Sequence, residues 1–182
     1  MNNLPDNWIS DVMEKRAEFE SAPKPFPTPP LLDSIFYLVG EVAELGMELH
    51  AITRQGDLRN PGSKRNGISG ELGDSLFMLG TVAHQVGHQE LYTYNIFSGT
   101  KQSAIIHPSN RDLIDTCAVT QLLALELYDE LDNDGLLPVL ASATDILNDI
   151  YSNLETLSHW LDIDMTGALT STYTKIAERS GL

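Results

Sequence analysis

Apolar residues recur at spacings of three and four along most of the chain, which is the period of a helix with one buried face. In the clearest stretch, Leu38, Val42, Leu45 and Leu49 form such a stripe. The pattern predicts helices over residues 6–21, 31–52, 68–87, 110–132, 137–161 and 165–179. Asp6 stands where an N-cap of the first helix is expected. Every strong periodic signal is helical, so the sequence predicts an all-α fold.

The segments between the predicted helices differ in character. Residues 23–30 contain five prolines in eight positions, which forbids a helix and predicts an extended connector. Residues 53–67 are rich in Gly, Asn and charge, as loops are, and residues 88–110 show no regular pattern. A length of 182 residues fits one compact domain, so we treat residues 1–182 as a single unit.

Two pairs of acidic residues stand beside the apolar stripes of the second and third predicted helices. They are Glu41 with Glu44, and Glu71 with Asp74. Residues three apart share one face of a helix, so two such helices folded against each other would bring four carboxylates together. Four like charges repel at close range unless a cation lies among them. Oxygen ligands suit Mg²⁺, Mn²⁺ or Ca²⁺, so the sequence predicts a hard-metal site of a kind that often serves phosphate chemistry.

Each acidic pair taken alone is more typical of a solvated helix face, and only the two pairs together indicate a site. Glu48 lies on the same flank of its helix and fits a metal ligand and an ordinary surface acid equally well. His84 and His88 are spaced as zinc ligands can be, but no third histidine lies near them in the sequence, which favours surface or interface histidines.

The composition and net charge of the chain limit the classes of partner that it is expected to bind. The formal net charge is −15, which argues against binding to nucleic-acid polymers. No apolar run reaches the ~20 residues of a membrane helix, and the first residues do not resemble a signal peptide. The single cysteine, Cys117, cannot form an intrachain disulfide and is expected in the core. We therefore expect a cytoplasmic protein with no membrane contact.

Basic residues are few and unevenly placed. The chain has 11 Lys and Arg residues in total, yet four of them fall within 12 positions: Arg54, Arg59, Lys64 and Arg65. A solvated turn explains such a loop when it is taken alone. Placed between the two acidic helices, the loop also fits a clamp for a phosphate chain.

The paired acidic motif resembles that of the MazG-like, all-α NTP pyrophosphatase superfamily. The signature of that superfamily is an E-E-x-x-E helix followed by an E-x-x-D helix, and the matching phrases here are GEVAEL and GELGDSLFML. The closing segment LDIDMTGALTSTYTKIAER is also similar. Gly40 replaces the first glutamate of the signature, and Thr172 stands near a position where many members have Asn. The long stretch over residues 88–160 is similar to the dimeric dUTPase and dCTPase branch, whose chains look like a tandem duplication with one decayed half.

The resemblance implies a MazG-like helical bundle. Its catalytic hairpin would span about 31–88, a second hairpin about 110–161, and a closing helix about 165–179. A shift of 85 positions places Glu41 on Glu126 and Glu44 on Asp129, whereas a shift of 75 places Asp74 on Asp149. These matches fit a degenerate tandem of two hairpins, and they equally fit the general similarity of helical sequences.

The resemblance also implies Mg²⁺-dependent hydrolysis of a (deoxy)nucleoside triphosphate to the monophosphate and pyrophosphate, for house-cleaning or control of the nucleotide pool. Mg²⁺, or Mn²⁺ in its place, would be held by Glu41, Glu44, Glu71 and Asp74. Glu44 or Glu41 would orient the attacking water as general base. The residues expected to bind the phosphates are Arg54, Arg59, Lys64, Arg65, Lys175 and Arg179, and Trp8 or Phe26 would stack on the base.

The same resemblance leaves other functions open. Gly40 could mark a decayed site in a helical dimer that binds nucleotide or a partner without turnover. An enzyme like phosphoribosyl-ATP pyrophosphohydrolase would share the fold and the type of site. Wide apolar helix faces, together with the habit of this superfamily, predict a homodimer or a dimer of dimers.

Overall fold

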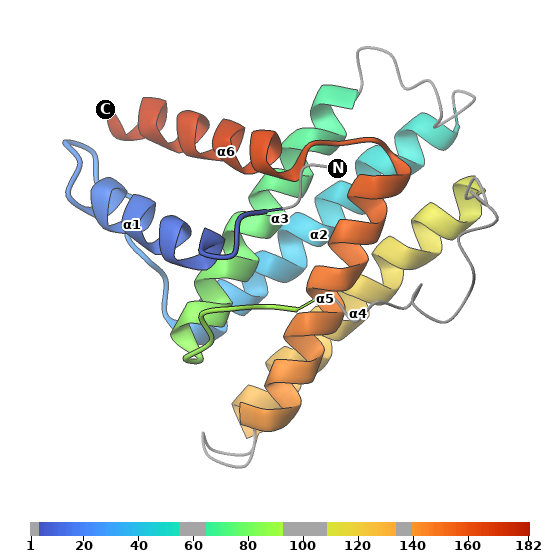
Figure 1. Cartoon of the computed structure of the whole chain (residues 1–182), viewed down its shortest axis with the longest axis horizontal. Helices are drawn as coiled ribbons and strands as arrows, with labels where there is room; N and C mark the ends of the chain where they lie inside the picture. Colours follow the sequence, from blue (N-terminus) through green and yellow to red (C-terminus); the bar gives the residue numbers. More distant parts are fainter. Residues whose placement is uncertain (1–3, 55–64, 93–108, 134–139) are drawn as a thin grey trace.

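The computed structural model describes residues 4–54, 65–92, 109–133 and 140–182, and every regular element in these ranges is a helix. The helices are α1 (Trp8–Glu20), α2 (Leu31–Thr53), α3 (Arg65–Gln85), α4 (Asn110–Asn133), α5 (Leu140–Trp160) and α6 (Met165–Ser180). Figure 1 shows their arrangement. The all-α prediction is confirmed, and each predicted boundary lies within about three residues of the observed one.

One detail at the start of α1 was predicted wrongly. Asn7, and not Asp6, occupies the N-cap position, and no side chain caps the helix. The amide of Trp8 donates to the carbonyl of Pro5 at 3.0 Å, so Asp6 lies inside a turn that precedes the helix. The Asn7 side chain instead donates to Asp11 at 2.9 Å.

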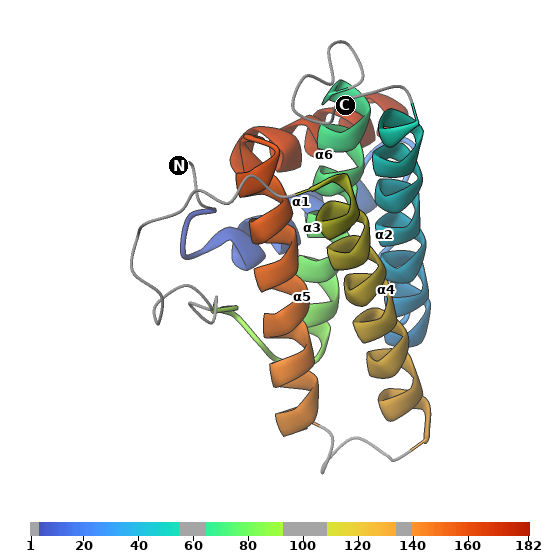
Figure 2. The same ribbon diagram turned by 90° about the vertical axis from the view of Figure 1, so that its right-hand side faces the viewer.

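Helices α2 to α5 form an antiparallel four-helix bundle (Figures 1 and 2). Helix α2 packs on α3 and α4, and α5 packs on α4 and α3. Helices α1 and α6 cross α3 on its remaining side. Helix α3 is therefore covered on all sides, and every residue from Leu72 to Ala83 is buried. This all-round burial explains why α3 carries so many small residues.

Glycines on α3 permit two of these close crossings. A Cβ at Gly73 would lie 2.3 Å from the carbonyl oxygen of Ala168 on α6. A Cβ at Gly80 would lie 2.8 Å from the ring of Trp8 on α1. Both distances are far below van der Waals contact, so any larger residue would push the crossing helix outward.

Residues 23–30 form the predicted extended connector between α1 and α2. The carbonyl of Pro29 accepts hydrogen bonds from the side chains of Gln85 at 2.8 Å and Ser34 at 3.2 Å. The amide of Phe26 donates to the carbonyl of Phe19 at 3.0 Å. These bonds hold the connector against α1 and the end of α3.

Arg16 of α1 is a buried arginine in the core and is 1% exposed. Its Nε donates to the hydroxyl of Thr81 at 2.5 Å, and its guanidinium carbon lies 4.4 Å from the centre of the Phe77 ring. No hydrogen-bond partner for its remaining terminal nitrogen, Nη1, lies within the part of the chain that is described. Burial lowers the pKa of Arg16 to about 10.

None of the helices in the described ranges combines the length and the apolar character that a membrane crossing requires.

Candidate metal centre

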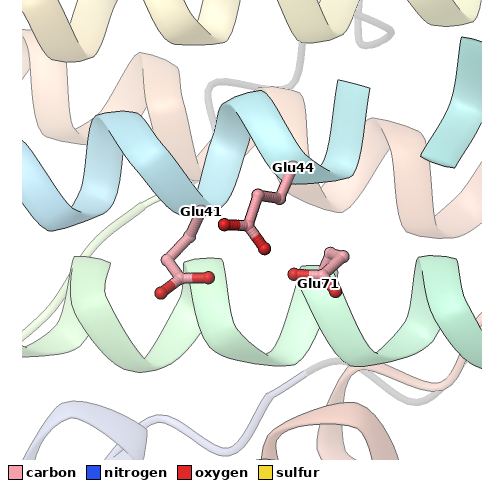
Figure 3. Close-up of side chains that lie close together, drawn as sticks. All are labelled: Glu41, Glu44 and Glu71. Carbon is pink, nitrogen blue, oxygen red and sulfur yellow. The ribbon is translucent and has the colours of Figure 1, made fainter. Parts of the chain in front are cut away.

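Three carboxylates from two helices converge between α2 and α3. Glu41 and Glu44 come from α2 and Glu71 comes from α3, and one oxygen from each lies within 4.8 Å of the others. Figure 3 shows the three side chains turned toward one another in the space between the two ribbons. They form the only such group of three or more potential metal ligands in the described ranges.

The helical period explains how the sequence builds this group. On α2, the buried stripe that includes Val42 and Leu45 faces the core, and Glu41 and Glu44 lie on the flank of that stripe that borders α3. Glu71 precedes the buried Leu72 on α3 and faces back toward α2. Glu41 and Glu71 are therefore partly buried at the edge of the core, and Glu44 is exposed beside them.

The group is electrostatically strained. Burial, followed by the charges of Asp74, Glu44 and Glu71, raises the pKa of Glu41 to about 7. Burial and the charges of Asp74 and Glu44 also raise the pKa of Glu71. Lys175 opposes both shifts, but it does not cancel them. The protein therefore holds these carboxylates closer together than their charges alone would favour.

Asp74 lies beside the three glutamates and has its own partners. It is 8% exposed, and its Oδ1 accepts a hydrogen bond from the hydroxyl of Thr172 at 2.8 Å. Its Oδ2 forms an ion pair with the ammonium of Lys175. Both partners come from α6, which can approach this closely because Gly73 lacks a side chain.

Glu48 lies at the C-terminal edge of the group. It is partly buried, and a Cβ added at Gly67 would come within 3.0 Å of its carboxylate. Its charge contributes to the raised pKa of Glu71. The structure therefore places Glu48 in the same electrostatic neighbourhood as the three glutamates.

The predicted phosphate-binding residues are not all brought to the site. Lys175 reaches Asp74, and Arg179 follows one turn later on α6 and is exposed. Arg54 is exposed beyond the end of α2. The helical period places it on the same side of the helix as Met47, and not on the side of Glu44. Of the other predicted residues, two, Arg59 and Lys64, lie outside the described ranges, and Arg65 begins α3 with a side chain that is not described.

The aromatic residues predicted to stack on a base lie elsewhere. Trp8 is 3% exposed and stacks on Tyr151 with ring centres 5.7 Å apart, so it belongs to the core. Phe26 is 36% exposed and lies beside Arg16, with the guanidinium carbon 5.9 Å from the ring centre. Cys117 is buried, as predicted.

Two residues near the site were not predicted to take part in it. Thr172 was noted only as a departure from the superfamily pattern, and its bond to Asp74 joins residues 98 positions apart in the chain. Tyr37 is 53% exposed and precedes Glu41 by one turn on the same flank of α2. Tyr37 and Glu41 are four residues apart, so the sequence could have indicated that both lie on one face of the helix. No local signal in the sequence pairs Thr172 with Asp74.

The second hairpin does not repeat the cluster within its described residues. Glu126, Asp129 and Asp149, the positions matched to the acids of the first hairpin, are all exposed. None of them belongs to a group of potential metal ligands among the residues described. Within the described ranges, the clustered acids therefore belong to the α2–α3 hairpin and not to the α4–α5 hairpin.

No protein-family model, curated protein or solved structure matches the chain. The fold and the site together define a class of protein: an all-α bundle with a carboxylate cluster on one helical hairpin. The resemblance to the MazG-like superfamily rests on the motif residues alone.

Proposed function

We propose that the chain is a metal-dependent nucleoside triphosphate pyrophosphohydrolase whose active site is the cluster of Glu41, Glu44, Glu71 and Asp74. The observation that carries the proposal is the approach of three carboxylates to within 4.8 Å, from two helices, with Asp74 and Lys175 alongside. The resemblance of the two acidic motifs to the MazG-like superfamily supplies the type of reaction.

The donor set fits a hard divalent cation. All of the clustered groups are carboxylates, and oxygen-only ligand sets suit Mg²⁺ and Mn²⁺ better than zinc. The raised pKa values of Glu41 and Glu71 reflect repulsion and burial. A cation held by Glu41, Glu44 and Glu71 would relieve that repulsion.

When bound, Mg²⁺ would offset negative charge on the phosphates and lower the pKa of the attacking water. Glu41 could orient that water as general base, because its carboxylate lies in the cluster beside Glu44 and Glu71. Glu44 is the alternative base, since it belongs to the same group and is exposed to solvent. Neither role requires any group outside the α2–α3 hairpin.

Residues of α6 would serve the phosphate chain. Lys175 pairs with Asp74, and a triphosphate would offer its ammonium additional oxygen partners. Thr172 holds the other oxygen of Asp74, which fixes the orientation of that carboxylate. Arg179, one turn further along α6, is exposed and could contact the outer phosphates.

The proposal is tested with a panel of NTPs, dNTPs and phosphoribosyl-ATP, incubated with Mg²⁺ or Mn²⁺ and analysed for monophosphate and pyrophosphate. Glu44→Gln removes one charge from the cluster at an exposed position, so it should abolish turnover while the helical circular dichroism signal is unchanged. Glu126→Gln is the matched control, because Glu126 is an exposed acid on α4 that belongs to no cluster of acids within the described ranges, and it should retain full activity.

Each outcome of that screen separates the alternatives. Activity on the panel that is lost in Glu44→Gln supports the proposal and identifies the preferred base. Activity that survives in Glu44→Gln would place the chemistry elsewhere. No turnover of any nucleotide by the folded protein would favour the decayed, binding-only module, and turnover of phosphoribosyl-ATP alone would favour the histidine-pathway type of enzyme.

A further inference from the structure

Arg16 of α1 keeps free hydrogen-bond donors inside the protein. It is 1% exposed, its Nε donates to the Thr81 hydroxyl at 2.5 Å, and its Nη2 contacts the Met78 sulfur at 3.3 Å. Its Nη1 has no hydrogen-bond partner among the described residues. A guanidinium has donors and no acceptor, and a buried charged donor without a partner is costly. The free donors therefore indicate a ligand that offers an acceptor.

The groups around Arg16 do not supply that acceptor. Burial lowers the pKa of Arg16, and the charge of Glu20 opposes that shift. The carboxylate of Glu20 accepts a hydrogen bond from the Thr28 amide at 2.8 Å, and Glu20 is exposed. The guanidinium carbon lies 4.4 Å from the ring centre of Phe77 and 5.9 Å from that of Phe26. These rings offer π faces to the cation but no acceptor oxygen to Nη1.

Two contacts show how α2 lies against α3 on either side of the metal cluster. Toward one end of the pair, a Cβ at Gly67 would lie 3.0 Å from the Glu48 carboxylate. Toward the other end, the Gln85 side chain donates to the Pro29 carbonyl at 2.8 Å. The helices are antiparallel, so the turns between these two contacts face one another in order. The facing residues are Glu44 with Glu71, Glu41 with Asp74, Tyr37 with Met78, and Ser34 with Thr81.

Arg16 therefore lies close to the proposed active site along the axis of α3. Its two α3 partners, Met78 and Thr81, are the residues that follow Asp74 along the flank of α3 that faces α2. One helical turn is about 5.4 Å long, so the guanidinium lies roughly one to two turns from the carboxylates. A nucleotide whose phosphates bind at the cluster places its base to one side of the cluster, at a distance of this order.

The two sides of the cluster differ in chemistry. On one side the next turn of α2 holds Glu48, a further acid. On the other side the next turn holds Tyr37, which is 53% exposed, opposite the thioether of Met78. An aromatic ring and a thioether pack well against the flat face of a base, whereas another carboxylate does not. The base is therefore expected on the Tyr37 side, toward Arg16.

We propose that Arg16 is a specificity-determining residue, which selects a base that carries a carbonyl oxygen on the edge away from the sugar. Such an oxygen is at position 4 of uracil and thymine and at position 6 of guanine and hypoxanthine. It accepts a hydrogen bond from Nη1, whereas the amino group of cytosine or adenine at the same position is itself a donor. The inference rests on the proposed function, because it requires a nucleotide whose phosphates bind at the cluster.

Entry of the base requires a side-chain movement, because Nη1 is enclosed. Phe26 lies beside the guanidinium, is 36% exposed and belongs to the connector of residues 23–30. The amide of Phe26 donates to the Phe19 carbonyl, and the ring can change its rotamer without breaking this bond. Rotation of the Phe26 ring toward solvent would open a path to Arg16.

The test is isothermal titration calorimetry of the full chain in Mg²⁺ with α,β-imido nucleotides, in which the bond between the α and β phosphates resists hydrolysis. The analogues of dUTP and dCTP form one pair and those of ITP and ATP another, and each pair differs at the far edge of the base by oxygen against amino group. In at least one pair the oxygen-bearing member should bind about 100-fold more tightly or better, because the amino member leaves a buried donor unpaired.

Arg16→Met removes the donors and keeps the packing against Phe77, so it should reduce this ratio to less than about 10-fold. Circular dichroism verifies that the variant is folded. Arg111→Met is the matched control, because Arg111 is an exposed arginine on α4 that pairs with Asp115. It makes the same chemical change away from the site and should leave the ratio as it is in the wild type.

Equal affinity within both pairs, or tighter binding of the amino members, would overturn the inference. A preference that survives in Arg16→Met, or one that Arg111→Met removes equally, would also overturn it, as would failure to bind any of the four analogues. Hydrolysis of the natural triphosphates is assayed separately. Selective binding without hydrolysis would contradict the proposed function alone, and hydrolysis by a chain without this selectivity would contradict the role of Arg16 alone.

Discussion

At the scale of single residues, four charged side chains lie in or at the edge of the core, and burial changes the pKa or the partners of each. Glu41 and Glu71 titrate above their usual range because they are partly buried beside other acids. Asp74 is more deeply buried but has a hydroxyl and an ammonium as partners. Arg16 is buried with no carboxylate bound to it among the described residues, and it relies on Thr81 and an aromatic face. Each of these environments has a measurable consequence.

The first prediction concerns the pH dependence of stability without metal. The folded-state pKa of Glu41 is about 7, above its value of 4.5 in the unfolded chain, so Glu41 stabilises the fold while it is protonated. This contribution, on the order of 2 kcal/mol, is complete below about pH 4.5 and is lost as the pH rises through 7. Glu41→Gln should therefore gain stability relative to wild type between pH 5 and pH 8. Urea unfolding in EDTA across this range measures the difference, and a difference independent of pH would contradict the assignment.

The second prediction concerns Arg16. Methionine of similar length would keep the packing against Phe77 and remove a buried charge that has one unpaired nitrogen. Thr81 would still donate to the carbonyl of Phe77 at 2.8 Å. Arg16→Met should therefore change the free energy of unfolding by less than about 1 kcal/mol or increase it, whereas Arg16→Ala should lower it by about 2 kcal/mol or more. Equal destabilisation by both variants would show that the guanidinium itself is required.

At the scale of elements, the crossing of α3 by α6 determines what surrounds Asp74. Helix α6 contributes Thr172 and Lys175, and it lies close enough to do so because Gly73 presents only backbone. The sequence E-L-G-D therefore combines two functions within four residues: its acids face the cluster and its glycine admits the next helix. A substitution in this motif that leaves every acid in place can still disrupt the site.

The third prediction follows from this crossing. Gly73→Ala should lower the free energy of unfolding by about 2 kcal/mol or more, because its Cβ would lie 2.3 Å from the Ala168 carbonyl, and it should reduce turnover by separating Lys175 from Asp74. Gly70→Ala is the matched control, since no atom lies within 4 Å of a Cβ there. The control should stabilise the helix by up to about 1 kcal/mol. Chemical denaturation of both variants, compared with wild type, measures this contrast, and equal effects would show that the crossing tolerates a side chain.

At the scale of the whole molecule, an acidic chain folds with a cluster of acids between α2 and α3, beside α6. The net charge of −15 destabilises the compact state through self-repulsion, and the cluster concentrates that repulsion between α2 and α3. A cation bound at the cluster would therefore stabilise the folded chain as a whole. This effect can be measured without any substrate.

The fourth prediction is stabilisation by Mg²⁺. A concentration of 100 times the dissociation constant should add about 2.7 kcal/mol to the free energy of unfolding. The gain should be smaller at pH 5 than at pH 8, because Glu41 is protonated at the lower pH. Thermal melts in Mg²⁺ are compared with melts in NaCl of equal ionic strength, which corrects for general screening. An equal Mg²⁺ effect in Glu44→Gln would contradict binding at the cluster.

Local sequence was sufficient to predict the helices and the acid pairs. A period of 3.6 residues determines which side chains share a face, so all six helices, to within about three residues at each end, and the flank occupied by Glu41, Glu44 and Glu71 could be predicted. The same period indicated the buried stripe of α2. It could not indicate that α3 is buried on every side, because that depends on how many helices pack around it.

Only the tertiary structure decided which residues surround the acids. Thr172 and Lys175 lie 98 and 101 positions from Asp74, and no local pattern pairs residues so far apart. The burial of Trp8 on Tyr151 and of Arg16 beside Phe77 likewise results from the packing of α1 onto the bundle. The sequence by itself determined helices and their faces, because these depend on near neighbours along the chain. The tertiary structure decided which faces meet, because that depends on the packing of every helix at once.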